Sequence, residues 1–452
     1  MKKLAIPTLI AATMCLTGCR LLTKLFKSDN GLSIEGDNAA YTVMIYMCGS
    51  DLESGYDGYS TNVNDAGLAS LDITEILSVT GQPNDVNIII ETGGAKAWKN
   101  KNVDVNKLCR FHVENQKLVK DETLSYASMG KSSTFQSFLE WGLTKYPADK
   151  TGVVLWNHGG AMMGVCYDEK QSNDSLTNSE VNTAIKNAFK KVGRTEKLEW
   201  IGYDACLMQV QDVADFNSEY FNYMIAAQES EAGEGWEYNT WIDDVYAKKD
   251  TNTILKAICD GFIASYQNMY GSQGYDNDQT LSYLDLSKMS AYKSAFEALA
   301  KKVSSTVGAT QKSAFQSMMK TVKEYGTAYY EDVTDGGYST NPNSDYYYGN
   351  YGVQYINGYY VDWGYNYFGT FDAKDFLNKL GNKYSSLSTE INSAKTALND
   401  LVVYNKIGGQ AGNSNGLCVY FPLHECCDKE NVYSSQQTGF SSWRTVVNTL
   451  GA

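Results

Sequence analysis

The chain has 452 residues, of which 43% are hydrophobic and 20% are charged, as in an ordinary globular protein. This length allows a full hydrophobic core and more than one domain. The net charge of -14 repels phosphate backbones, so we expect no nucleic-acid partner, whereas a cationic substrate would be attracted.

The N-terminal sequence MKKLAIPTLIAATMCLTGC has the pattern of an export signal, with a Lys pair before an apolar stretch too short to span a bilayer. Its end, LTGC, resembles the bacterial lipobox, in which the cysteine is lipidated and becomes the mature N-terminus. We predict a signal peptide over residues 1–18, lipidation at Cys19 and a tether over residues 19–40. The protein would then lie in the bacterial cell envelope, outside the cytoplasm, and contact the membrane through its lipid anchor. An ordinary signal peptide with a chance cysteine is the alternative.

From residue 41 onward, short apolar runs alternate with helical patterns, as in a parallel α/β sheet. Strands are predicted at residues 41–49, 86–94, 152–156, 198–206, 220–230 and 279–287. Helices are predicted from Ala69 and from Ser133, and a third between Thr177 and Gly193, where Thr177 and Glu180 form a capping-box pattern. Residues 95–128 suggest a hairpin that makes His112 a structural residue. Continuous apolar strands separated by helices indicate a sheet covered on both faces.

After about residue 290 the pattern changes to a long helical stretch, a segment rich in Tyr, Gly and Asn over residues 325–367, a helix near 372–380 and a strand at 416–422. We therefore divide the folded chain into a domain over residues 41–290 and a C-terminal α+β domain over residues 291–452 that completes the fold. The Tyr-rich tract suits either loop packing or a surface that contacts polymers or protein.

Reactive side chains follow two of the predicted strands. One strand continues into Asn157-His158-Gly159-Gly160 and the next into Asp204-Ala205-Cys206. Ligands bind at the carboxyl ends of parallel strands, so neighbouring strands would bring the imidazole and the thiol to one edge. A cysteine nucleophile needs an imidazole nearby to accept and return a proton. The backbone N–H of Gly159 could help to hold a developing oxyanion.

These blocks resemble the clostripain family of clan CD cysteine peptidases. The resemblance rests on YTVMIYMCGSDLE, WNHGG, GYDACLM, AAQESEAGEGW and GLCVYFP, which occur in the family's order, and covers residues 41–290 best. It implies a caspase-like fold, an α/β architecture with a mostly parallel central sheet flanked by helices. It also implies a dyad of His158 and Cys206 that cleaves peptide bonds through a thioester.

The resemblance further implies protein or peptide substrates with a basic residue before the cut, and Asp204 as the carboxylate at the base of the pocket. Asp204 has a competing interpretation as a helix cap. The chemistry itself requires no cofactor, but family members are often calcium-dependent and activated by self-cleavage, for which Lys170 is the candidate position. We expect a monomer.

Ser50 and Cys48, which end the first strand, and Glu229 and Glu231, which follow a later one, are further candidates for substrate binding. We predict no metal ligands, since the chain has no CxxC pair, and interpret His424, beside Cys426 and Cys427, as structural. A surface lipoprotein of the same fold that binds protein or glycan through the Tyr-rich tract, without catalysis, is the alternative function. A serine hydrolase is not supported, because no GxSxG sequence is present.

Overall fold

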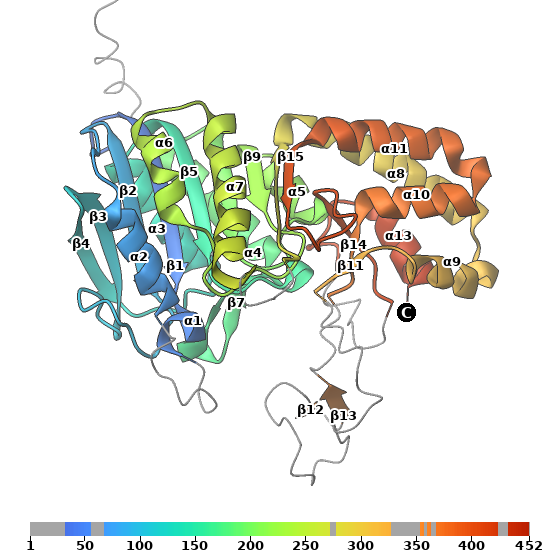
Figure 1. The fold of residues 1–452 in the computed structure, drawn as a ribbon, viewed down its shortest axis with the longest axis horizontal. Helices are drawn as coiled ribbons and strands as arrows, with labels where there is room; N and C mark the ends of the chain where they lie inside the picture. Colours follow the sequence, from blue (N-terminus) through green and yellow to red (C-terminus); the bar gives the residue numbers. More distant parts are fainter. Residues whose placement is uncertain are drawn as a thin grey trace, which may run out of the picture.

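Figure 1 shows the computed structural model of the chain, which describes residues 32–55, 67–271, 277–326, 353–356, 359–362, 368–423 and 433–451. Nine strands of this part form one mixed sheet in the order β15-β10-β9-β8-β5-β1-β2-β3-β4. Its five central strands are parallel: β1 (Ala39–Cys48), β2 (Val86–Gly93), β5 (Ala148–Trp156), β8 (Leu198–Asp204) and β9 (Phe221–Ala226). Both edges are antiparallel, with β3 (Lys107–Glu114) and β4 (Lys117–Ser125) at one and β10 (Thr280–Asp285) and β15 (Val402–Ile407) at the other.

Helices cover both faces of this sheet (Figure 1). One face packs against α2 (Leu68–Ser78), α6 (Ile242–Tyr246) and α7 (Thr251–Tyr270). The other packs against α3 (Ser132–Lys145), α4 (Asn178–Val192) and α5 (Gln211–Asn217). Side chains of β1 alternate between these two cores, so the strand is buried throughout residues 41–48 and is apolar at every one of these positions except Thr42, whose hydroxyl donates to the Tyr146 carbonyl.

The local signals at α4 explain why that helix begins and ends where it does. Thr177 and Glu180 form the predicted capping box, with the Glu180 amide donating to Thr177 Oγ1 over 3.2 Å and the Thr177 amide donating to Glu180 Oε2 over 3.1 Å. Gly193 ends the helix with a φ of 68° in the left-handed region, which glycine adopts without strain. α4 leads into β8 and so sets the position of the residues that follow it.

The C-terminal part forms a helical layer beside the sheet (Figure 1). Its helices are α8 (Met289–Thr306), α9 (Lys312–Met319), α10 (Ala373–Lys383), α11 (Ser388–Leu401) and α13 (Ser441–Leu450). They share a hydrophobic core with α3, α4 and α5, and after α11 the chain returns to the large sheet as β15. A small antiparallel sheet joins β11 (Glu324–Tyr325), β14 (Thr370–Asp372) and β16 (Cys418–Tyr420).

The small sheet is attached to the segments beside the strand ends of the large one. The Cys418 amide donates to the Gln209 carbonyl over 2.8 Å, and the Gly416 amide donates to Gln228 Oε1 over 2.6 Å. Gln228 Nε2 in turn donates to Asp372 Oδ2 over 3.1 Å. The C-terminal residues therefore support the loops after β8 and β9.

The remaining elements are short. They are α1 (Ser50–Ser54), the pairs β6 (Val165–Asp168) with β7 (Asp174–Leu176) and β12 (Val353–Ile356) with β13 (Tyr359–Asp362), and the 3-10 turns η1 (Ala161–Met163), η2 (Glu169–Gln171), η3 (Tyr238–Thr240), η5 (Leu286–Lys288), η6 (Ala309–Gln311) and η7 (Ser385–Leu387). In the described ranges, no helix combines the length and apolarity that a membrane crossing requires.

The predicted caspase-like α/β fold is confirmed, with parallel strands at the centre and both faces covered. The hairpin predicted in residues 95–128 is β3 and β4. The strand predicted at residues 416–422 is β16, which pairs with β14 in the small sheet. β15, which pairs with β10, was not predicted from the sequence. Both pairings join residues far apart in the chain, which local patterns do not encode.

Candidate active site

His158 and Cys206 follow adjacent parallel strands. β5 pairs with β8 in a register that places Trp156 opposite Asp204. His158 lies two residues after Trp156, and Cys206 lies two residues after Asp204. The predicted neighbourhood of the two strands is therefore confirmed. Because parallel strands end at the same edge, the imidazole and the thiol emerge there together.

Gly159 holds the two loops together at close range. A Cβ atom on Gly159 would lie 2.1 Å from the Cys206 carbonyl oxygen, so only glycine allows this approach. The His158 carbonyl accepts a hydrogen bond from the Cys166 amide over 3.3 Å, and Gly159 forms an isolated bridge with Val165. The backbone of the histidine loop is thus fixed on one side by β6 and on the other by the cysteine loop.

Asn157 fixes the start of the histidine loop. Its Nδ2 donates to the Cys48 carbonyl over 2.7 Å, and its Oδ1 accepts from the Tyr167 amide over 2.6 Å. The side chain is buried and joins the ends of β1 and β6. Asn157 therefore restricts the backbone from which the next residue, His158, projects.

The imidazole of His158 is half-buried and paired with a carboxylate. Its Nε2 lies 2.7 Å from Asp51 Oδ1, in α1 just beyond the end of β1. Ser50 donates its hydroxyl to the same oxygen over 2.9 Å. Ser50 itself is 1% exposed and has a φ of 52°, so it lies beneath Asp51 rather than open to a ligand.

The thiol of Cys206 is partly buried by the loop after β9. The Glu231 amide donates to Cys206 Sγ over 3.2 Å. Burial, together with the charge of Glu231, raises the pKa of the thiol to about 12. The cysteine is therefore neutral in this form and needs a base to become a nucleophile.

Asp204 is 3% exposed and belongs to a group of carboxylic acids with the buried Asp72 and the half-buried Glu231. Its oxygens accept from the Trp236 amide over 3.2 Å and from the Tyr238 hydroxyl over 3.0 Å. Burial raises the pKa of Asp204 to about 7, and burial together with the charge of Asp204 raises those of Asp72 and Glu231. This group can hold protons at neutral pH and could neutralise a cation.

The helix-cap interpretation of Asp204 is wrong for the next helix, because Val210 occupies the N-cap position of α5. Asp72 adds a further buried oxygen to the group. Its Oδ2 accepts from Trp156 Nε1 over 2.6 Å, while Oδ1 has no hydrogen-bond partner. The side of the site beneath Cys206 is therefore strongly acidic.

Glu229 and Lys170 make contacts within the protein. Glu229 Oε1 accepts from the amides of Ser230 and Gly326, each over 2.9 Å, which connects the loop after β9 to the start of the Tyr-rich tract. Lys170 lies in η2, donates to the Val105 carbonyl and places its Nζ 4.2 Å from the centre of the Tyr126 ring. A proteolytic cut after Lys170 would need this turn to open.

Several predicted features lie outside the described residues. They are Cys19 with the signal and tether, His424 with Cys426 and Cys427, and most of the Tyr-rich tract. His112, by contrast, is described. Its Nδ1 lies 3.1 Å from Asp121 Oδ2 between β3 and β4, away from the site, in agreement with the structural role predicted for it.

The methionines after the glycines differ in position. Met162 is buried in the core, whereas Met163 is 37% exposed beside Gly160. An added Cβ on Gly160 would also meet Tyr167 and Phe368. The outer face of the histidine loop is therefore apolar.

Sequence reasoning missed Asp51 and the role of Asn157. The signal was available, since β1 was predicted as a buried strand and the polar residues after it had to lie at its carboxyl end. Cys48 and Ser50 were the candidates from that segment, but both are buried and the neighbouring Asp51 contacts His158. The tertiary structure, in which β1 pairs with β5, is needed to show that Asp51, and not Cys48 or Ser50, reaches the imidazole of His158.

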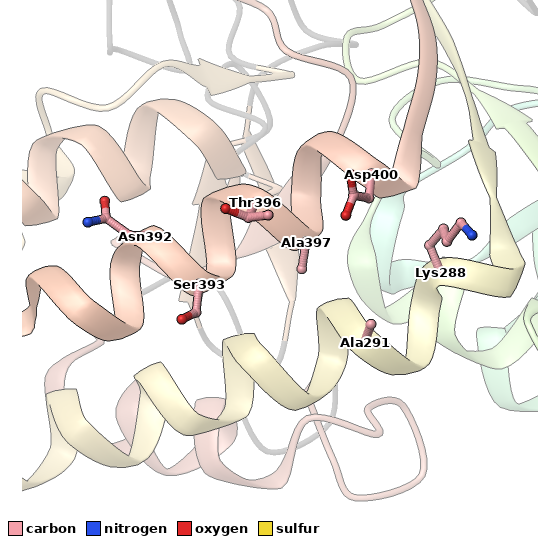
Figure 2. A pocket seen from close by; sticks show the side chains of 7 residues that line it. All are labelled: Lys288, Ala291, Asn392, Ser393, Thr396, Ala397 and Asp400. Carbon is pink, nitrogen blue, oxygen red and sulfur yellow. The ribbon is translucent and has the colours of Figure 1, made fainter.

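Elsewhere, a shallow hollow of about 390 Å³ lies between α8 and α11 in the helical layer (Figure 2). It is lined by Lys288, Ala291, Asn392, Ser393, Thr396, Ala397 and Asp400. These residues are not part of the dyad's surroundings. Among the described residues, no group of three or more His, Cys, Asp or Glu side chains is arranged to hold a metal ion.

A caspase-like sheet with a thiol and an imidazole on adjacent loops defines a cysteine peptidase. The model of the clostripain family matches residues 46–433, and the chain belongs to this family. The clostripain of Hathewaya histolytica is 22% identical over 401 residues, covering 77% of this chain and 68% of that protein.

Two solved structures share the fold. One is a secreted C11 cysteine protease from Bacteroides thetaiotaomicron in complex with an irreversible peptide inhibitor, with 16% identity, a TM-score of 0.58 and coverage of 90% of this chain and 99% of that one. The other is an inactive zymogen C11 protease from Parabacteroides distasonis, with 19% identity, a TM-score of 0.57 and coverage of 90% and 98%.

Proposed function

We propose that this cysteine peptidase is an exported, lipid-anchored endopeptidase that cleaves after Arg or Lys, with Cys206 as nucleophile and His158 as general base. The observation that carries the proposal is the register of β5 with β8, together with the contact of Gly159 with the Cys206 carbonyl. These two features fix the loops that bear the imidazole and the thiol. The family match favours this proposal over the alternative of a binding protein without catalysis.

The chemistry follows from the neutral thiol. His158 accepts the thiol proton as the sulfur attacks the scissile carbonyl carbon, and the carbonyl electrons move to the oxygen. A backbone N–H such as that of Gly159 would stabilise the resulting oxyanion. The intermediate collapses to a thioester when the imidazolium returns its proton to the leaving amine. Water, activated by the same imidazole, then releases the acid and regenerates the thiol.

Asp204 supports a preference for a basic side chain. A carboxylate facing a Lys or Arg head group forms a charge-assisted pair that a neutral side chain cannot replace. Trp236 and Tyr238 cover this carboxylate here, so the incoming cation must displace them or bind first to the more exposed Glu231. Ser50 and Glu229, our other candidates for substrate contact, are engaged within the protein and would act by supporting the loops.

The dyad is tested with fluorogenic peptides ending in Arg, Lys, Asp or Leu. Replacing Cys206 with Ala is expected to abolish cleavage of the Arg and Lys peptides. Cys259→Ala is the matched control, because Cys259 is a free cysteine buried in α7, far from the site. Activity that survives Cys206→Ala would refute the assignment.

Anchoring and calcium need separate tests. If Cys19 carries the lipid, radiolabelled palmitate is incorporated into the protein, and Cys19→Ser releases the protein from the membrane fraction. A membrane-bound, lipid-free protein would contradict the anchor. Calcium dependence is proposed from the family resemblance alone. A chelator titration of peptidase activity measures any calcium requirement.

A further inference from the structure

Asp51 lies at the end of β1, the strand next to β5, and its Oδ1 is 2.7 Å from His158 Nε2. We propose that Asp51 is a positioning residue for His158. It accepts the Nε2 hydrogen and leaves Nδ1 as the nitrogen that exchanges a proton with the Cys206 thiol. The inference rests on the proposed dyad and adds a third member to it.

Asp51 is held in the state that this role requires. Burial would raise the pKa of its carboxyl, but the hydrogen bond and charge of His158 outweigh burial, and the net pKa lies below the usual value. Ser50 also donates to Oδ1, which keeps this oxygen directed at the imidazole. The carboxylate is therefore an anion at neutral pH.

The backbone supports the same geometry. Ser50 adopts a φ of 52°, which non-glycine residues rarely do, and this turns the chain sharply between β1 and α1. The Gly49 amide donates to the Gly93 carbonyl of β2 over 2.8 Å, and Asn157 ties the end of β1 to the histidine loop. The two partners therefore lie just beyond the ends of adjacent strands, in segments held by backbone hydrogen bonds.

Other ionisable groups surround the pair, but each is engaged elsewhere. They are Cys48, Glu53, Asp168 and Glu169 from β1, α1, β6 and η2, and Glu229 and Glu231 from the loop after β9. Cys48 bonds to Tyr167, Glu53 to Ser70 and Lys99, and Asp168 to Tyr126 and Met129. Glu169 bonds to Lys96, Glu229 to Ser230 and Gly326, and Glu231 to Trp236. Asp51 is the carboxylate of this set that bonds to His158.

The proposed role of Asp51 follows the protons on the two nitrogens of His158. When the sulfur attacks, the S–H proton moves to Nδ1 and the imidazole becomes a cation with hydrogens on both nitrogens. The Nε2 hydrogen remains on nitrogen and donates to the Asp51 carboxylate, which stabilises the cation without itself becoming protonated. When Nδ1 gives its proton to the leaving amine, the neutral imidazole returns with its hydrogen on Nε2.

The test measures kcat and KM for an Arg or Lys peptide between about pH 5 and pH 9 in the full protein and its variants. We expect Asp51→Asn to lower kcat by about tenfold to a hundredfold with little change in KM, since loss of a counter-charge shifts a titration by about one to three units. The acid limb of the pH–rate profile, where protonation of the general base removes activity, should move to lower pH. Asp51→Glu, which restores the charge, should recover part of both effects.

Asp121→Asn is the matched control. It removes the carboxylate of the His112 pair, 3.1 Å from that imidazole and remote from the dyad, so kcat and the pH–rate profile should stay unchanged. A folded Asp51→Asn protein with the original kcat and profile would overturn the inference. If Asp51→Asn is unchanged but Cys206→Ala is inactive, only the role of Asp51 is refuted and the dyad assignment stands. An active Cys206→Ala protein would refute the dyad itself.

A second readout does not need activity. In the Cys206→Ala protein, the ¹⁵N chemical shifts of the His158 ring report which nitrogen carries the hydrogen. We expect the Nε2–H tautomer with Asp51 present. A dominant Nδ1–H tautomer would overturn the inference even if Asp51→Asn fails to fold.

Discussion

Gly159 and Cys206 are in backbone contact, so close that a Cβ atom on Gly159 would come within 2.1 Å of the Cys206 carbonyl oxygen. The neighbour is main chain, which cannot move aside as a flexible side chain can. This single contact sets the separation between the loop that carries the imidazole and the loop that carries the thiol. Glycine is therefore required at this position for geometry, in addition to any role of its amide.

Replacing Gly159 with Ala should lower kcat/KM on the order of a hundredfold, because misplacing reacting groups by about 1 Å has an effect of that size. Measuring kcat/KM and the thermal midpoint together separates misalignment from unfolding. Gly409→Ala is the control, since an added Cβ there meets no atom within 4 Å. Equal activity of the two variants would show that the close contact is unimportant.

The pKa of Asp204, raised to about 7 by burial, predicts a pH-dependent substrate preference. Below this pH the acid is neutral and cannot pair with a cation, so kcat/KM for Arg and Lys peptides should increase as the pH rises through about 7. Asp72 and Glu231 share these protons, which will broaden the transition. The measurement is kcat/KM against pH with peptides that differ only in the residue before the cut.

Asp204→Asn should remove most of the preference for Arg and Lys over Leu, by about a hundredfold or more, because a buried cation would lose its counter-charge. A variant that keeps the preference would assign the selectivity to another carboxylate, with Glu231 the next to test.

Asp212 predicts a pH-dependent stability. It is buried at the start of α5, where Thr438 and Tyr433 donate to Oδ1, and burial raises its pKa to about 7. The native state keeps a proton that the unfolded chain loses from about pH 4 upward. The free energy of unfolding should therefore fall as the pH rises from about 4 to about 7, by an amount on the order of a few kcal/mol from this group.

Asp212→Asn should reduce this pH dependence and make the protein more stable than the wild type at pH 8, in urea unfolding of the inactive Cys206→Ala background. The same loss of stability between pH 4.5 and pH 8 with and without the substitution would contradict the prediction.

Lys170 tests the predicted self-cleavage. If the chain cuts itself after this residue, the purified protein gives two fragments by mass spectrometry, and Lys170→Gln or Cys206→Ala leaves one intact chain. The side chain's contacts with Val105 and Tyr126 predict a slow cut, since η2 must first open. A cut that persists in Lys170→Gln would place the processing site elsewhere.

Much of the candidate site could be predicted because its reactive residues directly follow predicted strands in the sequence. The runs before His158 and Cys206 are mostly apolar, so both residues were expected to follow buried strands, and the structure shows that these strands are adjacent. The capping box of α4 was equally local. The fold class followed from the alternation of such runs with helical patterns.

Asp51 and β15 could not be predicted, for a common reason. Each acquires its role from a partner that is distant in the chain, His158 for Asp51 and β10 for β15. Asp204 was a candidate from the family resemblance, but its burial behind Trp236 and Tyr238 depends on how the loop after β9 folds back. Residue type and spacing predict which groups gather at a sheet edge, whereas tertiary pairing decides which are exposed.

The bond from the Cys418 amide to the Gln209 carbonyl has a consequence for biosynthesis. Gln209 is three residues after the nucleophile, yet its partner Cys418 is synthesised much later. A nascent or truncated polypeptide that contains both dyad residues but not Cys418 still lacks this support of the nucleophile's loop. Full peptidase activity is therefore expected only after Cys418 has been synthesised.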